Sequence, residues 1–167
     1  LDSVVCRKLQ LKGTELPDLN KWKNFLKNLN SPKNTVDIGL IGKYVELKDS
    51  YISIAEALIH AGANNQTKIN LHWVHSSKIE ENNIQTIIGE MDGILVAPGF
   101  GERGIDGKIS AVKYARENHI PFLGICLGMQ CAVIEFARNV LKIQNANTTE
   151  IDANCSSAVI DMMKEQK

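Results

Sequence analysis

The sequence lacks an excess of charge of either sign. Nineteen Lys and Arg residues balance nineteen Asp and Glu residues, so the formal net charge is zero. A domain that binds nucleic acid usually carries a basic face, and this composition does not indicate one. We therefore expect no nucleic acid among the partners, and favour a small molecule or another protein.

Long apolar runs are also missing. No stretch approaches the roughly 18 continuous apolar residues that a membrane span needs, and the first residues do not resemble a signal peptide. The four cysteines form no C-x-x-C pair and are scattered, which argues against a disulfide framework or a zinc site. We expect a cytoplasmic protein with no membrane contact.

What is present, in 167 residues of which 44% are apolar, is the pattern of one α/β domain. Residues 1–34 are rich in Lys and Asn and predict a linker with a short helix over 18–29. From residue 35 onward, short apolar runs alternate with amphipathic segments, which predicts an open, doubly wound, mostly parallel sheet with helices on both faces. The predicted strands are 36–41, 69–73, 93–97 and 121–125, the last two buried, and the predicted helices are 52–62, closed by Gly62, then 84–91, 107–118 and 129–140. The clearest helical stripe comprises Met129, Ala132, Val133, Phe136, Ala137 and Val140.

A cysteine stands where the last predicted strand ends and this amphipathic helix begins. The partial positive charge of a helix N-terminus favours a thiolate at Cys126, and the flanking Gly124 and Gly128 leave space around the sulfur in a tight turn. The N–H group of Leu127 is placed to stabilise an oxyanion. We interpret Cys126 as a nucleophile, against the alternative of a small buried core residue. We expect Cys131, one turn further on, only to pack.

The cysteine turn is one of several recognisable segments along the chain. They are Ile41–Leu47, Asp49–Tyr51, Gly99–Gly104, Pro121–Gln130, Glu135–Arg138 and Asn145–Glu150. The run from Gly124 to Gln130 resembles the signature of class I glutamine amidotransferases, and the whole set resembles the CTP synthase family. The resemblance implies a flavodoxin-like glutamine amidotransferase domain over 35–167, truncated at its C-terminus, and an interdomain linker over 1–34.

The same resemblance implies roles for residues around the cysteine. Cys126 attacks the side-chain amide of glutamine, forms a glutamyl thioester and releases ammonia, while the backbone of Gly99 and Leu127 forms the oxyanion hole. An amino acid's ammonium group favours a carboxylate such as Glu150, whose alternative interpretation is a solvated loop residue. The implied glutamine-binding positions are Gly99, Leu127, Gly128, Met129, Gln130 and Glu150, and no metal ligand is expected.

The resemblance extends to what such enzymes contain as a whole. They are ligases of pyrimidine biosynthesis, in which an N-terminal synthetase domain binds ATP, Mg and UTP and uses the ammonia to make CTP. GTP is an implied allosteric activator, and a homotetramer is the implied assembly. We expect no cofactor in the present domain, and L-glutamine and the synthetase domain of the same polypeptide as its partners.

Two glycine-containing segments allow other interpretations. Residues 99–104 fit G-x-G-x-x-G, but they follow an internal strand and no ribose-binding acid follows the next one, which disfavours a dinucleotide site. Gly42 and Lys43 do not form a phosphate-binding loop, because Tyr44 replaces the required Ser or Thr. We interpret Lys43 and Arg103 as surface charges, although the resemblance suggests that Arg103 lies near a regulatory nucleotide.

A histidine base after the cysteine is missing. The resemblance implies a histidine oriented by a glutamate, both far downstream, but none of the four histidines follows Cys126. Only His75 ends a strand on the correct sheet edge, and it is three strands away, about 14 Å at ~4.8 Å per strand. We therefore expect His60, His72, His75 and His119 to be structural or solvent-facing, and the isolated chain to be inactive.

Three functions stay open. The first is the glutaminase part of the CTP synthase family, and the second is another class I amidotransferase or a cysteine hydrolase of similar fold. The third is a non-catalytic binding or assembly domain in which Cys126 has lost its role. The segments 99–104 and 145–150 favour the first over the second. The missing base favours the third for the isolated chain, whereas the intact cysteine turn favours the first for the parent protein.

Overall fold

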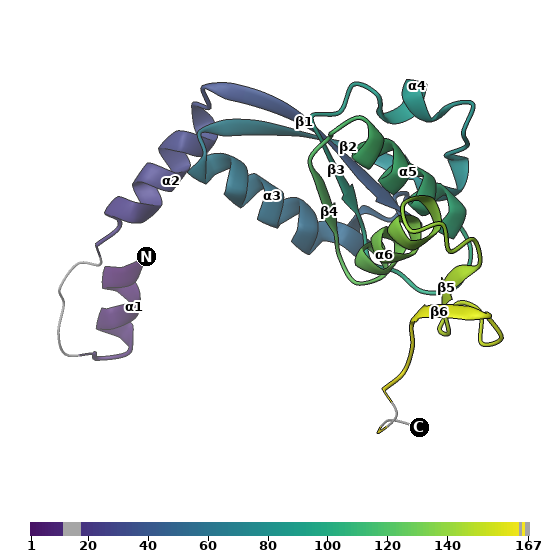
Figure 1. Cartoon of the computed structure of the whole chain (residues 1–167). Helices are drawn as coiled ribbons and strands as arrows, with labels where there is room; N and C mark the ends of the chain where they lie inside the picture. Colours follow the sequence, from purple (N-terminus) through teal and green to yellow (C-terminus); the bar gives the residue numbers. More distant parts are fainter. Residues whose placement is uncertain (12–17, 164, 166–167) are drawn as a thin grey trace.

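The chain forms a parallel sheet between two layers of helices in a computed structural model that describes residues 1–11, 18–163 and 165 (Figure 1). The elements in chain order are α1 (Asp2–Lys8), α2 (Asn20–Asn30), β1 (Asn34–Gly42), η1 (Lys48–Tyr51), α3 (Ile52–Asn64), β2 (Thr67–His75), η2 (Ser76–Lys78), α4 (Ile84–Ile88), β3 (Gly93–Val96), α5 (Ile105–Glu117), β4 (Phe122–Gly124), α6 (Leu127–Asn139), β5 (Ala146–Thr148) and β6 (Ser157–Ile160). The predicted strands and helices are confirmed, with ends that differ by a few residues. The helix α1 was not predicted.

The four main strands lie in the order β2-β1-β3-β4, and every neighbouring pair is parallel. Strand order reverses beside β1, as in flavodoxin-like folds, and ligands of such sheets bind beyond the carboxyl ends of the strands. β5 and β6 form a separate parallel pair after α6. The predicted doubly wound α/β class is therefore confirmed.

Alternating strand residues face two different helix layers. Leu40 and Leu95 are buried in a cluster with residues of α3, whereas Ile41, Ile94 and Val96 are buried in a cluster with residues of α5 and α6. This division follows from the two-residue repeat of a strand, which points successive side chains to opposite faces. The sheet therefore has a core on each side, and its strand ends are held rigidly.

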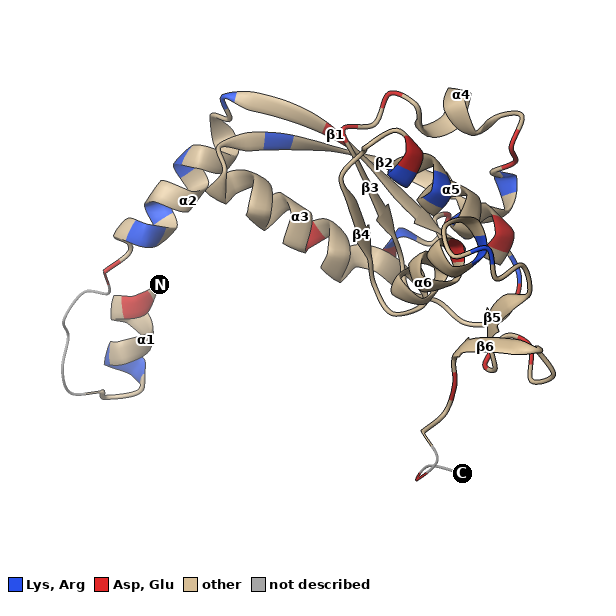
Figure 2. Ribbon diagram, viewed as in Figure 1, with Lys and Arg blue, Asp and Glu red and all other residues tan. Residues whose placement is uncertain are grey.

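The helix predicted near the N-terminus is α2, and it packs on α3. Phe25 contacts the ring of His60 edge-on at 5.2 Å between centroids and stacks on Trp22. Three lysines of this helix, Lys21, Lys23 and Lys27, contribute to a surface on which both signs of charge are distributed (Figure 2). None of the helices in the described part of the chain is long and apolar enough to cross a membrane.

Two expectations about burial are wrong. The strand at 121–125 was expected to be buried, but β4 is an edge strand whose Leu123 is 55% exposed. The predicted core stripe of α6 is only partly buried: Ala137 is 3% exposed, but Met129 is 52% and Phe136 48% exposed. The helix has a second apolar face, with Leu127 and Ile134 buried, and this face packs on the sheet. With β4 at the edge, the outward face extends past the sheet and lines an apolar groove.

Gly62 does not close the third helix as expected. α3 continues to Asn64, and Gly62 lies buried inside it. A Cβ atom at Gly62 would lie 2.6 Å from the carbonyl oxygen of Thr67, so the glycine is required by the close approach of β2. Packing, rather than helix termination, explains this glycine.

Candidate active site

Cys126 occupies a strained turn between β4 and α6. It is the N-cap residue of α6 with φ 53° and ψ −111°, a backbone conformation that residues other than glycine rarely adopt. Its side chain is exposed. Such strain costs on the order of 1–3 kcal/mol and persists only where the surrounding structure imposes it. The thiol is thereby presented to solvent at the positive end of a thirteen-residue helix, where negative charge is stabilised.

The glycines on either side allow the turn to pack tightly. A Cβ atom at Gly128 would collide with the carbonyl oxygen of Val96 in β3, and one at Gly124 would lie 2.6 Å from the backbone of Gly128. Ile125 donates its N–H group to the same Val96 oxygen at 3.1 Å. Gly124 and Gly128 therefore permit the close contact between strand and helix that holds Cys126 in place, as in nucleophile elbows.

Two backbone donors near the cysteine have no acceptor in the described part of the chain. Val96 of β3 pairs with Gly124 of β4, so the segments that follow these parallel strands emerge side by side and carry Gly99 and Cys126. The Leu127 side chain lies 3.8 Å from the Cβ position of Gly99. Neither the Gly99 N–H nor the Leu127 N–H donates a hydrogen bond within the described residues. Unpaired N–H groups at this place suit a developing oxyanion.

Gln130 and Glu150, two of the predicted glutamine-binding residues, are in contact. Gln130 Nε2 donates a hydrogen bond to Glu150 Oε2 at 3.2 Å, although the residues are twenty positions apart. The other side-chain atom, Gln130 Oε1, is buried without a hydrogen-bond partner in the described structure. An acceptor of this kind next to an exposed carboxylate suits an ammonium group. The side chain of Met129 points outward, so only its backbone is available to the site.

The loop over 99–104 is hydrogen-bonded to Lys43, which directly follows β1 and which was interpreted from the sequence as a surface charge. Lys43 Nζ donates a hydrogen bond to the carbonyl oxygen of Phe100 at 3.0 Å. The same ammonium group lies 5.6 Å from the ring centroid of Tyr44, a cation–π contact. The interpretation of Lys43 is therefore incomplete, because its side chain holds the loop that carries Gly99.

Three of the four histidines have other contacts, and His119 is exposed after α5, as expected. His72 Nε2 lies 2.6 Å from Asp37 Oδ1, and His75 Nδ1 accepts a hydrogen bond from the Ser77 N–H group. His60 contacts Phe25 in the helix layer. β2, which ends at His75, is three strands from β4 in the observed order. No histidine of the described chain is therefore placed to act on Cys126.

One residue beneath the site was missed by sequence reasoning. Lys108 of α5 is 1% exposed, and its Nζ donates a hydrogen bond to the carbonyl oxygen of Ala97 at 2.9 Å. The predicted stripe of α5 contained the signal, because Lys108 precedes Val112 by one helical repeat and shares its buried face. Cys131, as expected, only packs: burial raises its pKa to about 11.

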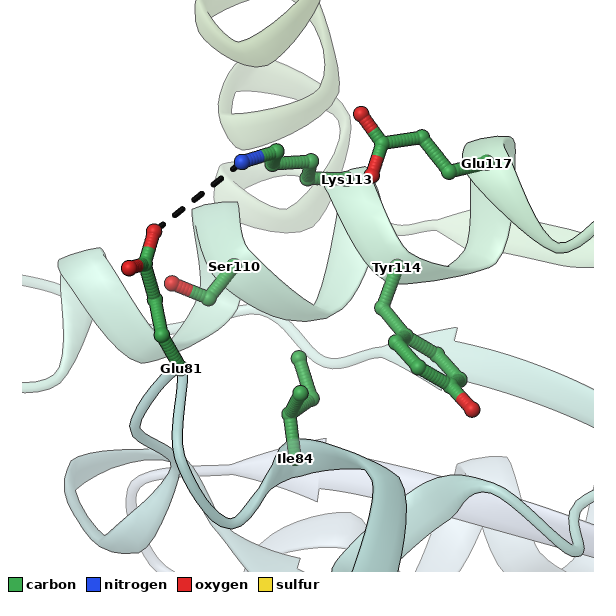
Figure 3. A pocket seen from close by; sticks show the side chains of 6 residues that line it. All are labelled: Glu81, Ile84, Ser110, Lys113, Tyr114 and Glu117. Atoms are coloured by element: carbon green, nitrogen blue, oxygen red, sulfur yellow. Dashed lines mark ion pairs between the residues drawn. The ribbon is translucent and has the colours of Figure 1, made fainter.

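A cavity of about 240 Å³ lies elsewhere, between α5 and the segment around α4 (Figure 3). A weak ion pair of 3.9 Å between Lys113 and Glu81 spans its rim. The residues that line it are Glu81, Ile84, Ser110, Lys113, Tyr114 and Glu117. None belongs to the cysteine site, so this cavity is separate from the candidate chemistry.

Comparisons with known proteins identify similar sequences and a similar structure. Residues 46–165 match the family model described as glutamine amidotransferase class-I. The chain is 54% identical to a CTP synthase of Methanocaldococcus jannaschii and 58% identical to one of Christiangramia forsetii, and is covered completely in both alignments while spanning 32% and 31% of those proteins. The chain thus spans about a third of the length of these relatives. A solved structure, the Trypanosoma brucei CTPS glutaminase domain with bound acivicin, matches with a TM-score of 0.74 and 35% identity over 79% of this chain and 52% of that one.

Proposed function

The chain belongs to the class-I glutamine amidotransferase family, and from this membership we propose that it hydrolyses the side-chain amide of glutamine at Cys126. The observation that carries the proposal is the strained turn at the start of α6, which presents an exposed thiol beside the unpaired N–H groups of Gly99 and Leu127. A buried structural cysteine needs neither the strain nor the unpaired donors.

The proposed reaction begins with glutamine bound through its amino-acid group. Glu150, an exposed carboxylate held by Gln130, accepts hydrogen bonds from the substrate ammonium, which leaves the side-chain amide near Cys126. The backbone of Gly128 and Met129, in the first turn of α6, completes the pocket wall. Binding of this kind fixes the amide carbon before any bond changes.

The chemical step converts the amide into a thioester. The Cys126 thiolate attacks the amide carbon, and the negative charge that develops on the oxygen is stabilised by the Gly99 and Leu127 N–H groups. The C–N bond then breaks, the nitrogen takes a proton and leaves as ammonia, and water hydrolyses the glutamyl thioester to glutamate. Protonation of the leaving nitrogen requires an acid–base group, and none of the described histidines is placed to act as that group.

We further propose that the ammonia serves the ATP-dependent amination of UTP to CTP, as the names of the relatives suggest. In that account residues 1–34 connect this domain to a synthetase domain of the same polypeptide, in a cytoplasmic homotetramer that GTP activates. The described residues contain no cluster of three or more His, Cys, Asp or Glu side chains able to hold a metal ion. We propose that ATP, Mg and UTP bind to the synthetase domain.

The proposed function is tested with the intact protein supplied with either glutamine or free ammonia. Cys126→Ser is expected to abolish CTP formation from glutamine and to leave CTP formation from ammonia unchanged, because only the first needs the thiol. Cys131→Ala, one helical turn away, is the matched control and is expected to keep both activities. Glutamine-dependent activity in Cys126→Ser would contradict the proposal.

A further inference from the structure

Lys108 is a buried cation next to the candidate nucleophile. Its side chain runs from the first turns of α5 into the core, where only 1% of the residue is exposed. The single hydrogen bond that its ammonium group makes within the described residues goes to Ala97, the residue that follows β3. Ala97 in turn donates its N–H group to Ile41 of β1 at 2.9 Å.

The surroundings of this ammonium contain no carboxylate partner. Among the described residues, Lys108 forms no ion pair within 4.0 Å. The ionisable groups whose charges act on its pKa are Cys131 in α6, Lys43 after β1 and Cys126 in the turn after β4. A buried cation without a counter-charge is costly, so an aliphatic side chain would fill this space at less cost.

The two thiols are the groups able to supply that counter-charge. Burial lowers the pKa of Lys108 below its ordinary value of 10.5, whereas the nearby Cys131 and Cys126 sulfurs raise it. A positive charge at Lys108 favours negative charge on a nearby sulfur. Burial keeps Cys131 in the neutral form near pH 7, since its pKa is about 11. Cys126 is therefore the thiol whose negative charge Lys108 can stabilise.

Lys108 also lies directly behind the loop that carries the oxyanion donor. Its Nζ atom is 3.5 Å from the point where a Cβ atom at Gly99 would lie. The carbonyl group to which it donates belongs to Ala97, two residues earlier in the chain. Gly99 thus lies between the lysine and the side chain of Leu127. The hydrogen bond to Ala97 holds the backbone where it leaves β3, two residues before Gly99.

We propose that Lys108 is a positioning residue for the glutaminase reaction, which holds the Gly99 loop through the Ala97 carbonyl and places a positive charge behind Cys126. The inference rests on the proposed function, because both effects act on the thiolate and the oxyanion. The Lys108 side chain makes two contributions, the hydrogen bond and the charge. Each contribution is removed by a different substitution.

The test measures alkylation of Cys126 in the intact protein by a glutamine-like chloroketone, followed by mass spectrometry across a range of pH. Lys108→Met keeps an unbranched side chain of nearly the same length but removes the hydrogen bond and the charge. Lys108→Gln removes the charge and keeps an N–H donor for Ala97, on a side chain one bond shorter. The matched control is Lys113→Met on the exposed side of the same helix.

Lys108→Met is expected to slow labelling near neutral pH by about tenfold or more, the usual effect of losing a charged hydrogen bond. In the same variant, the rate of Cys126 labelling is expected to rise only at a higher pH than in the parent protein. Lys108→Gln is expected to recover part of the rate and to keep the shifted pH profile. Lys113→Met is expected to behave like the parent protein.

A structural role alone would lower the thermal unfolding temperature and leave the pH profile unchanged, and that result would overturn the inference. If Lys108→Met does not fold, the pH profile of Lys108→Gln decides in the same way. If glutamine does not slow labelling of the parent protein, the proposed function itself fails, and the inference with it. A parent that is protected by glutamine, together with Lys108 variants of unchanged profile, overturns the inference alone.

Discussion

Gln130 donates a hydrogen bond from Nε2 to Oε2 of Glu150 at 3.2 Å and leaves its own Oε1 atom buried without a partner. The first residue lies in the first turn of α6 and the second follows the short strand β5, so the contact joins the cysteine helix to the β5–β6 pair. The contact places a carboxylate and an unpaired acceptor together within one helical turn of Cys126. This arrangement is the basis of the proposed binding of the glutamine ammonium group.

Replacing Glu150 is expected to weaken glutamine binding without changing the thiol. In Glu150→Gln, the glutamine concentration that halves chloroketone labelling of Cys126 should rise about 10- to 100-fold, because a charged hydrogen bond contributes about 1.5–3 kcal/mol. Labelling by iodoacetamide, which carries no amino-acid group, should stay unchanged. Glu90→Gln, an exposed carboxylate at the end of the α4 segment, is the control. Equal protection constants for the two variants would contradict the role of Glu150.

The glycine beneath the cysteine turn is expected to tolerate no side chain. In Gly128→Ala the new methyl group meets the carbonyl oxygen of Val96, so strand and helix must separate. The free energy of unfolding should fall by about 1–3 kcal/mol, as for other overpacked sites, when measured by urea denaturation. Gly99→Ala is the matched comparison, because its methyl group has ordinary contacts at 3.5 Å and 3.8 Å. Equal losses in the two variants would show that the turn is not tightly packed.

The pair of Asp37 and His72 is expected to make the folding stability depend on pH in the acidic range. The hydrogen bond from His72 is the main cause that lowers the pKa of Asp37 below its ordinary value of 3.8. Because the pKa is lower in the folded state, the stabilisation is present above pH 3.8 and is lost as the pH falls through the folded value.

The measurement is the thermal unfolding temperature of the parent and of His72→Gln at several acidic pH values. The parent should be the more stable protein near pH 5, and the difference should shrink as the pH falls below 3.8. His60→Gln, whose histidine has no carboxylate partner among the described contacts, serves as the comparison. A difference that stays constant or grows toward low pH would contradict the assignment.

The sequence alone was sufficient to predict the sheet and the cysteine turn. Apolar runs of four or five residues between amphipathic segments are strong signals, and the strand, glycine and cysteine at 121–128 form a local pattern that needs no distant contact. The turn that contains Cys126 also packs on Val96 of β3, a contact that the local pattern does not show. A local pattern therefore predicted a local structure.

Burial and long-range contacts could not be predicted in the same way. α6 has apolar residues on two faces, and only the order of the strands decides that Ile134 packs on the sheet while Phe136 faces outward. Likewise, Lys108 was overlooked because a lysine on a helix is usually exposed, and its partner Ala97 lies in another element. The contact between Gln130 and Glu150 depends on the chain returning after α6, which no periodicity encodes.

The most direct test of the account is whether glutamine protects Cys126. The intact protein is treated with a glutamine-like chloroketone with and without L-glutamine, and the modified cysteine is located by mass spectrometry, with Cys126→Ala as the control. The account predicts fast modification at Cys126 that glutamine slows, and none at the buried Cys131, whose pKa is raised to about 11. Modification of Cys126 no faster than that of Cys6 or Cys155, or insensitive to glutamine, would contradict a glutaminase site.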